Sequence, residues 1–151
     1  MTIKALEESL KVEKGIQSED LATGTETGVP VDTKNFDEAL IILDAGVATA
    51  TGTLDVTVEE GDTTGGSFTA IAGALFEQIV AANDERILVG RIRVKNFKRF
   101  IRIIAVVATD TVEASVIILL GKFDGLAPVV QNVDPVSFAI DFVQDGGTPS
   151  P

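Results

Sequence analysis

Residues 86–123 have the pattern of three consecutive β-strands joined by short polar turns. Upstream, residues 54–59 alternate strictly between apolar and polar side chains, the period of a strand with one buried face. Further strand patterns occupy residues 36–46 and 67–74, and the glycine-rich residues 61–66 form a turn signal between strands. Strands of about eight residues between turn signals are typical of a sandwich or barrel. We therefore predict an all-β fold, an antiparallel β-sandwich with a jelly-roll-like core.

Two details of the strand order follow from the same pattern. The three strands within residues 86–123 are expected to form a meander, in which each strand lies beside the next. Residues 75–85 fit either a short helix or an irregular strand, because their apolar residues match both spacings.

The chain divides into a central domain and two arms. Residues 1–34 are predicted as an N-terminal arm, with a helix over Ile3–Lys14 ended by Gly15 and then an extended connector. The alternative for this segment is a disordered tail. Residues 35–125 are predicted as the sandwich core, and residues 126–151 as a C-terminal arm.

The C-terminal arm contains a further strand pattern. Four apolar residues alternate with small or polar ones: Val136, Phe138, Ile140 and Phe142. Such a strand either closes the domain's own sheet or adds to a sheet in a neighbouring subunit. We predict that these four residues belong to a partner interface.

The composition argues against catalysis. The chain has no His and no Cys, so the commonest general base, the usual nucleophilic triads and thiolate metal sites are missing. The glycine-rich residues 61–66 lack the Gly-Lys-Ser/Thr ending of a phosphate-binding loop. We expect no enzymatic activity, no cofactor and no small-molecule substrate.

Two groups of oxygen ligands have a composition that suits calcium, which prefers carboxylate and amide oxygens. They are Asp32, Asn35 and Asp37, and Glu59, Glu60 and Asp62. Neither group matches an EF-hand loop, and acid-rich surfaces commonly serve solubility alone. We therefore expect no metal site.

The basic residues are concentrated although the chain is acidic overall. The net charge is −11, yet seven of the twelve Lys and Arg residues lie within residues 86–102, where there is no acid. Arg91, Arg93 and Lys95 alternate with apolar residues and therefore share one strand face. For Arg91 and Arg93 we predict pairing across strands with the polar face of residues 55–59. The alternative for this basic face is an intersubunit contact with an acidic patch.

Three further basic residues, Lys98, Arg99 and Arg102, lie at or beside a turn. For these we predict a partner interface, in which they meet an acidic patch on a neighbouring copy or on a partner shell. Nucleic acid is not expected as a partner, because the overall acidity repels phosphate. Phe97 and Phe100 are the only aromatic residues among the basic ones, and their pattern favours core positions over base stacking.

The longest apolar runs, residues 103–108 and 115–121, are far shorter than the roughly 20 residues of a membrane-spanning helix. Residues 1–14 mix acids with bases and lack the apolar core of a secretory signal. We expect a soluble protein that contacts no membrane and is used without export.

A longer motif runs from Gly90 to Val129. After the glycine come a basic–aromatic–aliphatic–Arg–aliphatic run, a Thr/Ala-rich turn, a strand ending in Leu-Gly and an Ala-Pro-Val. The residues are Gly90; Arg99, Phe100, Ile101, Arg102 and Ile103; Leu120 and Gly121; and Ala127, Pro128 and Val129. With the strand at 54–60 and the Gly-Ser-Phe-Thr at 66–69, the motif resembles a group of virion proteins of tailed bacteriophages over about residues 37–129.

The members that this segment resembles are head decoration (cement) proteins. The resemblance implies a β-sandwich or jelly-roll core, assembly as a homotrimer, and a place on the outer surface of the capsid. It implies a protein made in the host cytoplasm that bridges major capsid proteins and so stabilises the shell against the pressure of packaged DNA. The two arms would then reach adjacent subunits.

Two alternative functions stay open. One is another virion structural component, such as a tail-tube, head-completion or fibre-associated protein. The other is a carbohydrate-binding adhesion module, against which the absence of Trp and Tyr argues, because these residues usually supply the sugar-stacking surface.

Overall fold

The strands follow from the alternation of apolar and polar residues. The computed structural model describes residues 9–121. In β5, Leu54, Val56 and Val58 are buried whereas the side chains between them are only half-buried, as a period of two requires. The elements are β1 (Leu10–Leu21), β2 (Gly24–Thr27), β3 (Val31–Asp32), β4 (Glu38–Ala48), β5 (Thr53–Gly61), β6 (Phe68–Leu75), β7 (Ile79–Val80), β8 (Arg86–Ile92), the 3₁₀-helix η1 (Val94–Asn96), β9 (Phe100–Ala108) and β10 (Val112–Gly121).

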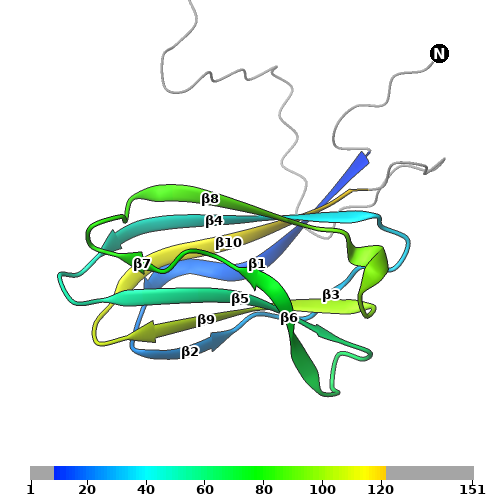
Figure 1. Ribbon diagram of the computed structural model, residues 1–151, viewed down its shortest axis with the longest axis horizontal. Helices are drawn as coiled ribbons and strands as arrows, with labels where there is room; N and C mark the ends of the chain where they lie inside the picture. Colours follow the sequence, from blue (N-terminus) through cyan, green and yellow to red (C-terminus); the bar gives the residue numbers. More distant parts are fainter. Residues whose placement is uncertain (1–8, 122–151) are drawn as a thin grey trace, which may run out of the picture.

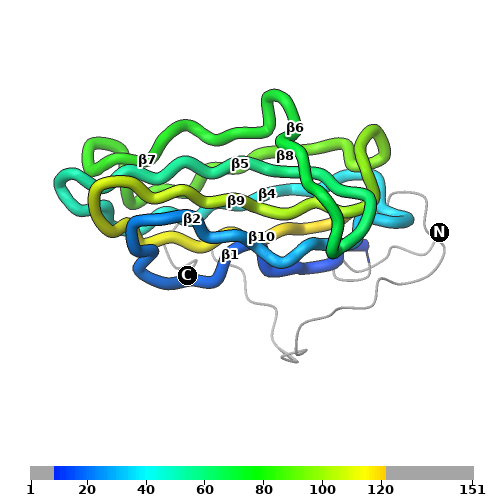
Figure 2. The backbone as a smooth tube through the Cα atoms, turned by 90° about the horizontal axis from the view of Figure 1, so that it is seen from below, coloured from blue at the N-terminus to red at the C-terminus, as the bar shows by residue number. Residues whose placement is uncertain are grey.

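Two antiparallel sheets form the layers of a sandwich (Figure 1). Sheet A has the strand order β1-β10-β4-β8, and sheet B has the order β2-β9-β5-β6, with β3 also beside β9 and β7 also beside β5. Figure 2 shows β2, β9 and β5 side by side in sheet B. The pairs are nested, since β1 pairs with β10, β2 with β9, β4 with β8 and β5 with β6. This is the arrangement of a jelly roll, so the predicted all-β sandwich is confirmed.

The core lies between the two sheets and is aliphatic. Phe36 and Phe76 pack against it from the border. Burying one large aliphatic side chain contributes about 1.5–3 kcal/mol to folding, so the packing of the two inner faces holds the layers together. The largest fully buried side chains are Ile41, Leu43, Leu54, Val56, Ile79, Ile101, Ile103, Val112, Val116, Ile118 and Leu120.

The three strands predicted within residues 86–123 are present as β8, β9 and β10, but the predicted meander is wrong. β8 lies in sheet A beside β4, β9 lies in sheet B beside β5, and β10 lies in sheet A between β1 and β4. Each connection therefore crosses from one sheet to the other. Alternation along a segment makes it a strand, but its neighbours are determined by which layer can bury its apolar face.

The N-terminal prediction is also corrected. From Leu10 the chain forms β1, which pairs with β10 as far as Leu21, so the predicted helix over Ile3–Lys14 is wrong from that residue on. Ile16 and Leu21 are buried in the core, and this tertiary packing outweighs the helical spacing of the apolar residues before them. The extended connector is wrong as well, because β2 and β3 both pair with β9.

Residues 75–85 contain the two-residue strand β7, which pairs with β5, and therefore follow the irregular-strand alternative. The boundary predicted at residue 125 lies outside the described residues. So does the apolar strand predicted at Val136, Phe138, Ile140 and Phe142.

Candidate assembly surfaces

Arg99, in the turn before β9, binds Asp32 of β3 through two hydrogen bonds. Arg99 Nε donates to Oδ1 at 3.0 Å and Nη2 donates to Oδ2 at 2.7 Å. Because the guanidinium donates to the ionised carboxylate, it lowers the pKa of Asp32, and the carboxylate in turn raises the pKa of Arg99. The pair joins β3 to the start of β9, although its exposure limits what it adds to stability.

Arg102 of β9 and Glu59 of β5 are direct cross-strand neighbours on the outer face of sheet B. Arg102 Nε donates to Glu59 Oε2 at 2.7 Å, and Arg102 Nη2 lies 2.7 Å from the same oxygen. The guanidinium also lies 4.1 Å from the centroid of the Phe68 ring on β6, a cation–π geometry. Arg102 of β9 therefore contacts residues on both β5 and β6 and links three strands of sheet B.

Most other basic side chains of residues 86–102 also have acid partners within the chain. Their N–O distances are 2.9 Å for Arg86–Glu77, 3.8 Å for Arg93–Glu38, 2.6 Å for Lys95–Asp37 and 3.2 Å for Lys98–Asp62. The predicted pairing of Arg91 and Arg93 with residues 55–59 is wrong, because β8 pairs with β4 and not with β5. Arg93 and Lys95 also lie beyond the end of β8, with Lys95 in η1, so the three residues do not share one strand face. Arg91 is the basic residue of this stretch for which no acid partner occurs within residues 9–121.

The structure thus places the three predicted interface residues, Lys98, Arg99 and Arg102, along the start of β9, each in an ion pair. Their role toward a partner stays a prediction. A partner that used them would have to share or displace the carboxylates they already bind.

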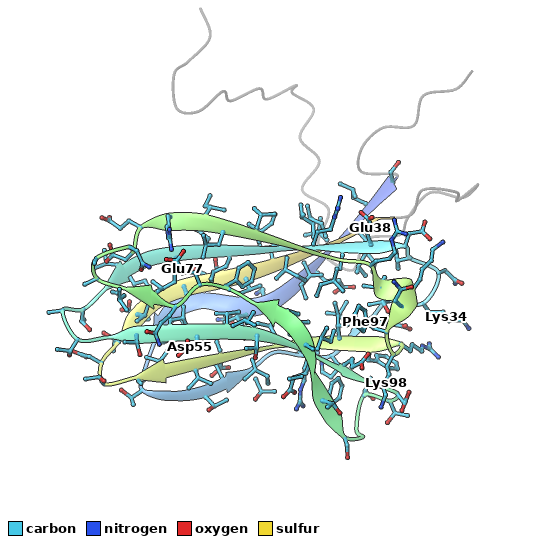
Figure 3. The ribbon with its side chains drawn as sticks, viewed as in Figure 1. Lys34, Glu38, Asp55, Glu77, Phe97 and Lys98 are labelled. Atoms are coloured by element: carbon cyan, nitrogen blue, oxygen red, sulfur yellow. The ribbon has the colours of Figure 1, made fainter. Side chains whose placement is uncertain are left out.

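An open depression of about 660 Å³ lies at the end of the sandwich near these residues. Figure 3 shows Lys34, Phe97 and Lys98 gathered at this end, with Asp55 and Glu77 toward the other. Phe97 is 38% exposed, but the surrounding charges have both signs. The lining is Thr33, Lys34, Asn35, Phe36, Asp37, Val94, Lys95, Phe97 and Arg99.

The two groups considered for calcium are engaged in other contacts. Asp32 binds Arg99, Asp37 binds Lys95, and Glu59 binds Arg102. The Glu60 carboxylate accepts a hydrogen bond of 2.8 Å from the backbone N–H of Lys98, and Asp62 pairs with the same lysine's side chain. Within residues 9–121, no three acidic side chains are grouped to hold a metal ion, and no helix is long and apolar enough to cross a membrane.

The outer face of sheet A carries an apolar patch that spans its four strands and is bordered by the exposed residues Lys14, Asp44 and Arg91. Cross-strand register places Val89, Ile42 and Ile117 in one row, on β8, β4 and β10 respectively. Leu40 and Leu119 occupy the next row. Val89 is 58% exposed and Ile117 is 43% exposed. We call this surface the sheet A patch, defined by Val12, Leu40, Ile42, Ile87, Val89, Ile117 and Leu119.

The outer face of sheet B is more polar. β5 presents Asp55, Thr57 and Glu59, as the alternation predicted, and β9 presents Arg102 beside Glu59. Val106 on β9 is apolar and faces outward opposite Asp55, with 38% of the residue exposed. Charged and hydroxyl groups therefore interrupt the middle of this face, whereas on sheet A the charged residues Lys14, Asp44 and Arg91 lie at the border of the patch.

The sheet A patch was not predicted as a binding surface, although the sequence contains a pattern that indicates it. Residues 39–43 and 116–120 are apolar at every position, so these strands carry apolar side chains on both faces. Only one face of each can point into a two-layer core. A run that is apolar at odd and even positions therefore indicates an apolar outer face.

No known family model matches the sequence, and no curated protein matches it either. Among solved structures, the chain is similar to the PBSX exported protein XepA, with a TM-score of 0.53 and 14% sequence identity. The match covers 88% of this chain and 43% of that protein, so this chain spans less than half of the protein it matches. At this identity the likeness concerns the fold: the two chains share a β-sandwich architecture.

Proposed function

We propose that the protein is a structural component of a phage virion and, within that class, a decoration protein that bridges major capsid proteins on the outer capsid surface. The observation that carries the proposal is the sheet A patch. Contiguous exposed apolar surface is uncommon on a soluble domain and commonly marks a protein–protein contact. Here it lies on a chain of net charge −11, whose other surfaces favour solubility.

Two further findings support a virion role. The jelly roll is a recurrent fold of viral capsid domains, although a fold by itself does not assign a function. The structural neighbour XepA is phage-related, in line with the motif of residues 90–129 that resembles decoration proteins.

The proposed mechanism is docking without chemistry. The patch side chains lose water against the shell, which contributes about 25 cal/mol for each Å² of apolar area buried, before the cost of association. Assembly as a homotrimer multiplies modest contacts, because three linked patches bind far more tightly than one. No catalytic group, cofactor or metal takes part in such a mechanism.

Co-sedimentation with empty capsids of the phage that carries the gene tests the proposal. Wild-type protein is expected to bind in multiples of three, and Ile117→Lys is expected to lower the bound fraction at least tenfold, because a charge in the patch centre must be desolvated. Val106→Lys is the matched control, since its side chain is exposed to a similar extent on the opposite sheet. The proposal would be overturned if the wild-type protein did not bind the capsids, or if both variants lowered the bound fraction equally.

Light scattering of the free protein supplies the second readout. A mass of three copies fits decoration at local three-fold positions, whereas a ring of six copies would point to a tail component instead.

A further inference from the structure

The two edges of sheet A differ in how they meet solvent. β1, at one edge, has register shifts between Lys14 and Ile16 and again between Ile16 and Glu19. Exposed Lys14, Glu19 and Asp20 line it. Bulges and charges are the devices by which proteins prevent an edge strand from pairing with another chain. The β1 edge is thus protected.

The β8 edge has charges at Arg86 and Arg91 but no bulge. β8 pairs with β4 in an unbroken register from Ala39–Ile92 to Ala45–Arg86, and within the described residues it has no second strand beside it. It contains no proline, and Ile87 is 62% exposed. A regular edge strand with apolar side chains is a template for a further strand.

An apolar groove of about 300 Å³ runs along this edge, between β8 and the end of β6. Its lining includes core residues from both sheets, Ile41 on β4 and Val58 on β5. A Cβ on Gly90 would lie 3.3 Å from the Phe76 ring, so Phe76 packs on the β8 backbone at the groove floor. The apolar lining includes Ile41, Val58, Ala74, Phe76, Leu88 and Ile92. Such a groove can accept the alternate side chains of an added strand.

We propose that the β8 edge binds the C-terminal segment Val136–Phe142 of a second copy, which adds a fifth strand to sheet A. The inference deepens the proposed function, on which it rests, because copies side by side on a shell are placed to exchange strands. The segment is as long as β8, with seven residues over 136–142 against seven in β8. Its four apolar side chains would enter the groove, and the three between them would extend the outer face.

Charge complementarity selects the direction of the added strand. When Ala139 lies opposite Val89, a parallel strand places Asp141 opposite Arg91, whereas an antiparallel strand places it opposite Ile87. Arg91 is exposed and has no acid partner within residues 9–121. An opposite-charge pair on one face favours pairing, so the parallel arrangement is preferred.

The parallel direction also bears on which copy supplies the segment. β10 ends at Gly121, opposite Glu38, and therefore at the same end of sheet A as Ile92 of β8. A parallel strand from the same chain would first have to return along the whole sheet, a distance of roughly 23 Å for seven residues. Residues 122–135 reach roughly 45 Å when extended, which would allow that return. A segment from a neighbouring copy needs no return, so the parallel direction favours a second copy, and disulfide trapping distinguishes the two sources.

Disulfide trapping tests the inference without capsids, and the natural chain contains no Cys to interfere. Val89→Cys and Ala139→Cys proteins, one of them carrying a mass tag, are mixed and mildly oxidised. We expect a mixed dimer, since residues 89 and 139 face each other in either direction and neighbouring strands have a separation that suits a disulfide. In the control, Val106→Cys replaces Val89→Cys, and its yield is expected to be at background.

A charge exchange adds specificity. Arg91→Glu in the Val89→Cys protein, or Asp141→Arg in the Ala139→Cys protein, is expected to lower the trapping yield about two- to fivefold, and the two together to restore it. Mixed-dimer yield at the control level would overturn the inference. So would a Val89→Cys/Ala139→Cys chain that closes only on itself, which would assign the segment to its own sheet. Ile117→Lys in the Val89→Cys protein is expected to leave the yield of trapped dimer unchanged and to abolish capsid binding. The trapping yield therefore tests the strand exchange, and the co-sedimentation assay tests the proposed function separately.

Discussion

A Cβ atom on Gly28 would overlap the backbone carbonyl oxygen of Gly15, so the β1 edge of sheet A and the segment after β2 meet backbone to backbone. The Gly28 N–H also donates to the carbonyl of Ile103 at 2.8 Å. On β1, a Cβ atom on Gly15 would lie 2.9 Å from side-chain carbons of both Ile103 and Val116. Two glycines therefore allow the two sheets to close on this side of the sandwich.

Gly28→Ala is expected to destabilise the protein by about 1–3 kcal/mol, because an added methyl group must displace backbone. The measurement is the free energy of unfolding in urea. Gly65→Ala is the control, since a Cβ there has open space around it, and its effect is expected within about 0.5 kcal/mol. Equal stability of the two variants would mean that the backbones at Gly15 and Gly28 do not meet closely enough to exclude a methyl group.

The Glu59–Arg102 pair is expected to couple weakly in the fold. A double-mutant cycle with Glu59→Gln and Arg102→Met should give an interaction energy of up to about 1 kcal/mol, as for partly exposed pairs. The same variants in the capsid co-sedimentation assay test the predicted interface role of Arg102. Loss of binding with unchanged stability supports that role, and unchanged binding assigns the arginine to the fold alone.

The Asp32–Arg99 pair should make stability depend on pH in the acid range. Hydrogen bonding to Arg99 lowers the pKa of Asp32 below its usual value of 3.8. The stabilisation is therefore complete above that value and is lost as the pH falls through the lowered pKa of the folded state. Between pH 5 and pH 2, the urea midpoint of the wild type should fall more than that of Asp32→Asn.

Glu26→Gln serves as the control for this titration, because Glu26 is an exposed acid on β2. It should retain the acid dependence of the wild type. A wild type and an Asp32→Asn variant with parallel pH profiles would show that the ion pair adds nothing to folding.

Deletion of residues 134–151 is expected to leave the core folded and to weaken self-association and capsid attachment. Within residues 9–121 the two sheets already bury a continuous aliphatic core, so the free energy of unfolding should change by less than about 1 kcal/mol. Circular dichroism and urea unfolding measure the fold, and light scattering measures the mass. An unfolded product would instead assign the deleted strand to the protein's own sheet.

The strands were predictable where one face is buried. Leu54, Val56 and Val58 are buried and Asp55 and Thr57 face outward, as their alternation predicts. β1 escaped prediction because its register shifts interrupt the alternation between Lys14 and Glu19. A bulge moves the following side chains to the other face, so no single period describes the segment.

The candidate surface was less predictable than the strands. The run at residues 116–120 indicates burial, but which of Val116 and Ile117 faces the core depends on the layer to which β10 belongs. The acid partners of Arg93 and Lys95 were likewise missed, because they come from the start of β4, more than fifty residues earlier. Pairing across such separations leaves no periodic signal.

By itself the sequence determined that the chain is an antiparallel β protein with an aliphatic core and no His or Cys chemistry, because side-chain period and composition are local properties. Only the tertiary structure decided that β8, β9 and β10 alternate between layers and that six of the seven clustered basic residues are paired with acids. It also decided that an apolar patch lies on the outside of sheet A. Each of these depends on which distant segments become neighbours, and the best overall burial of apolar faces determines that choice.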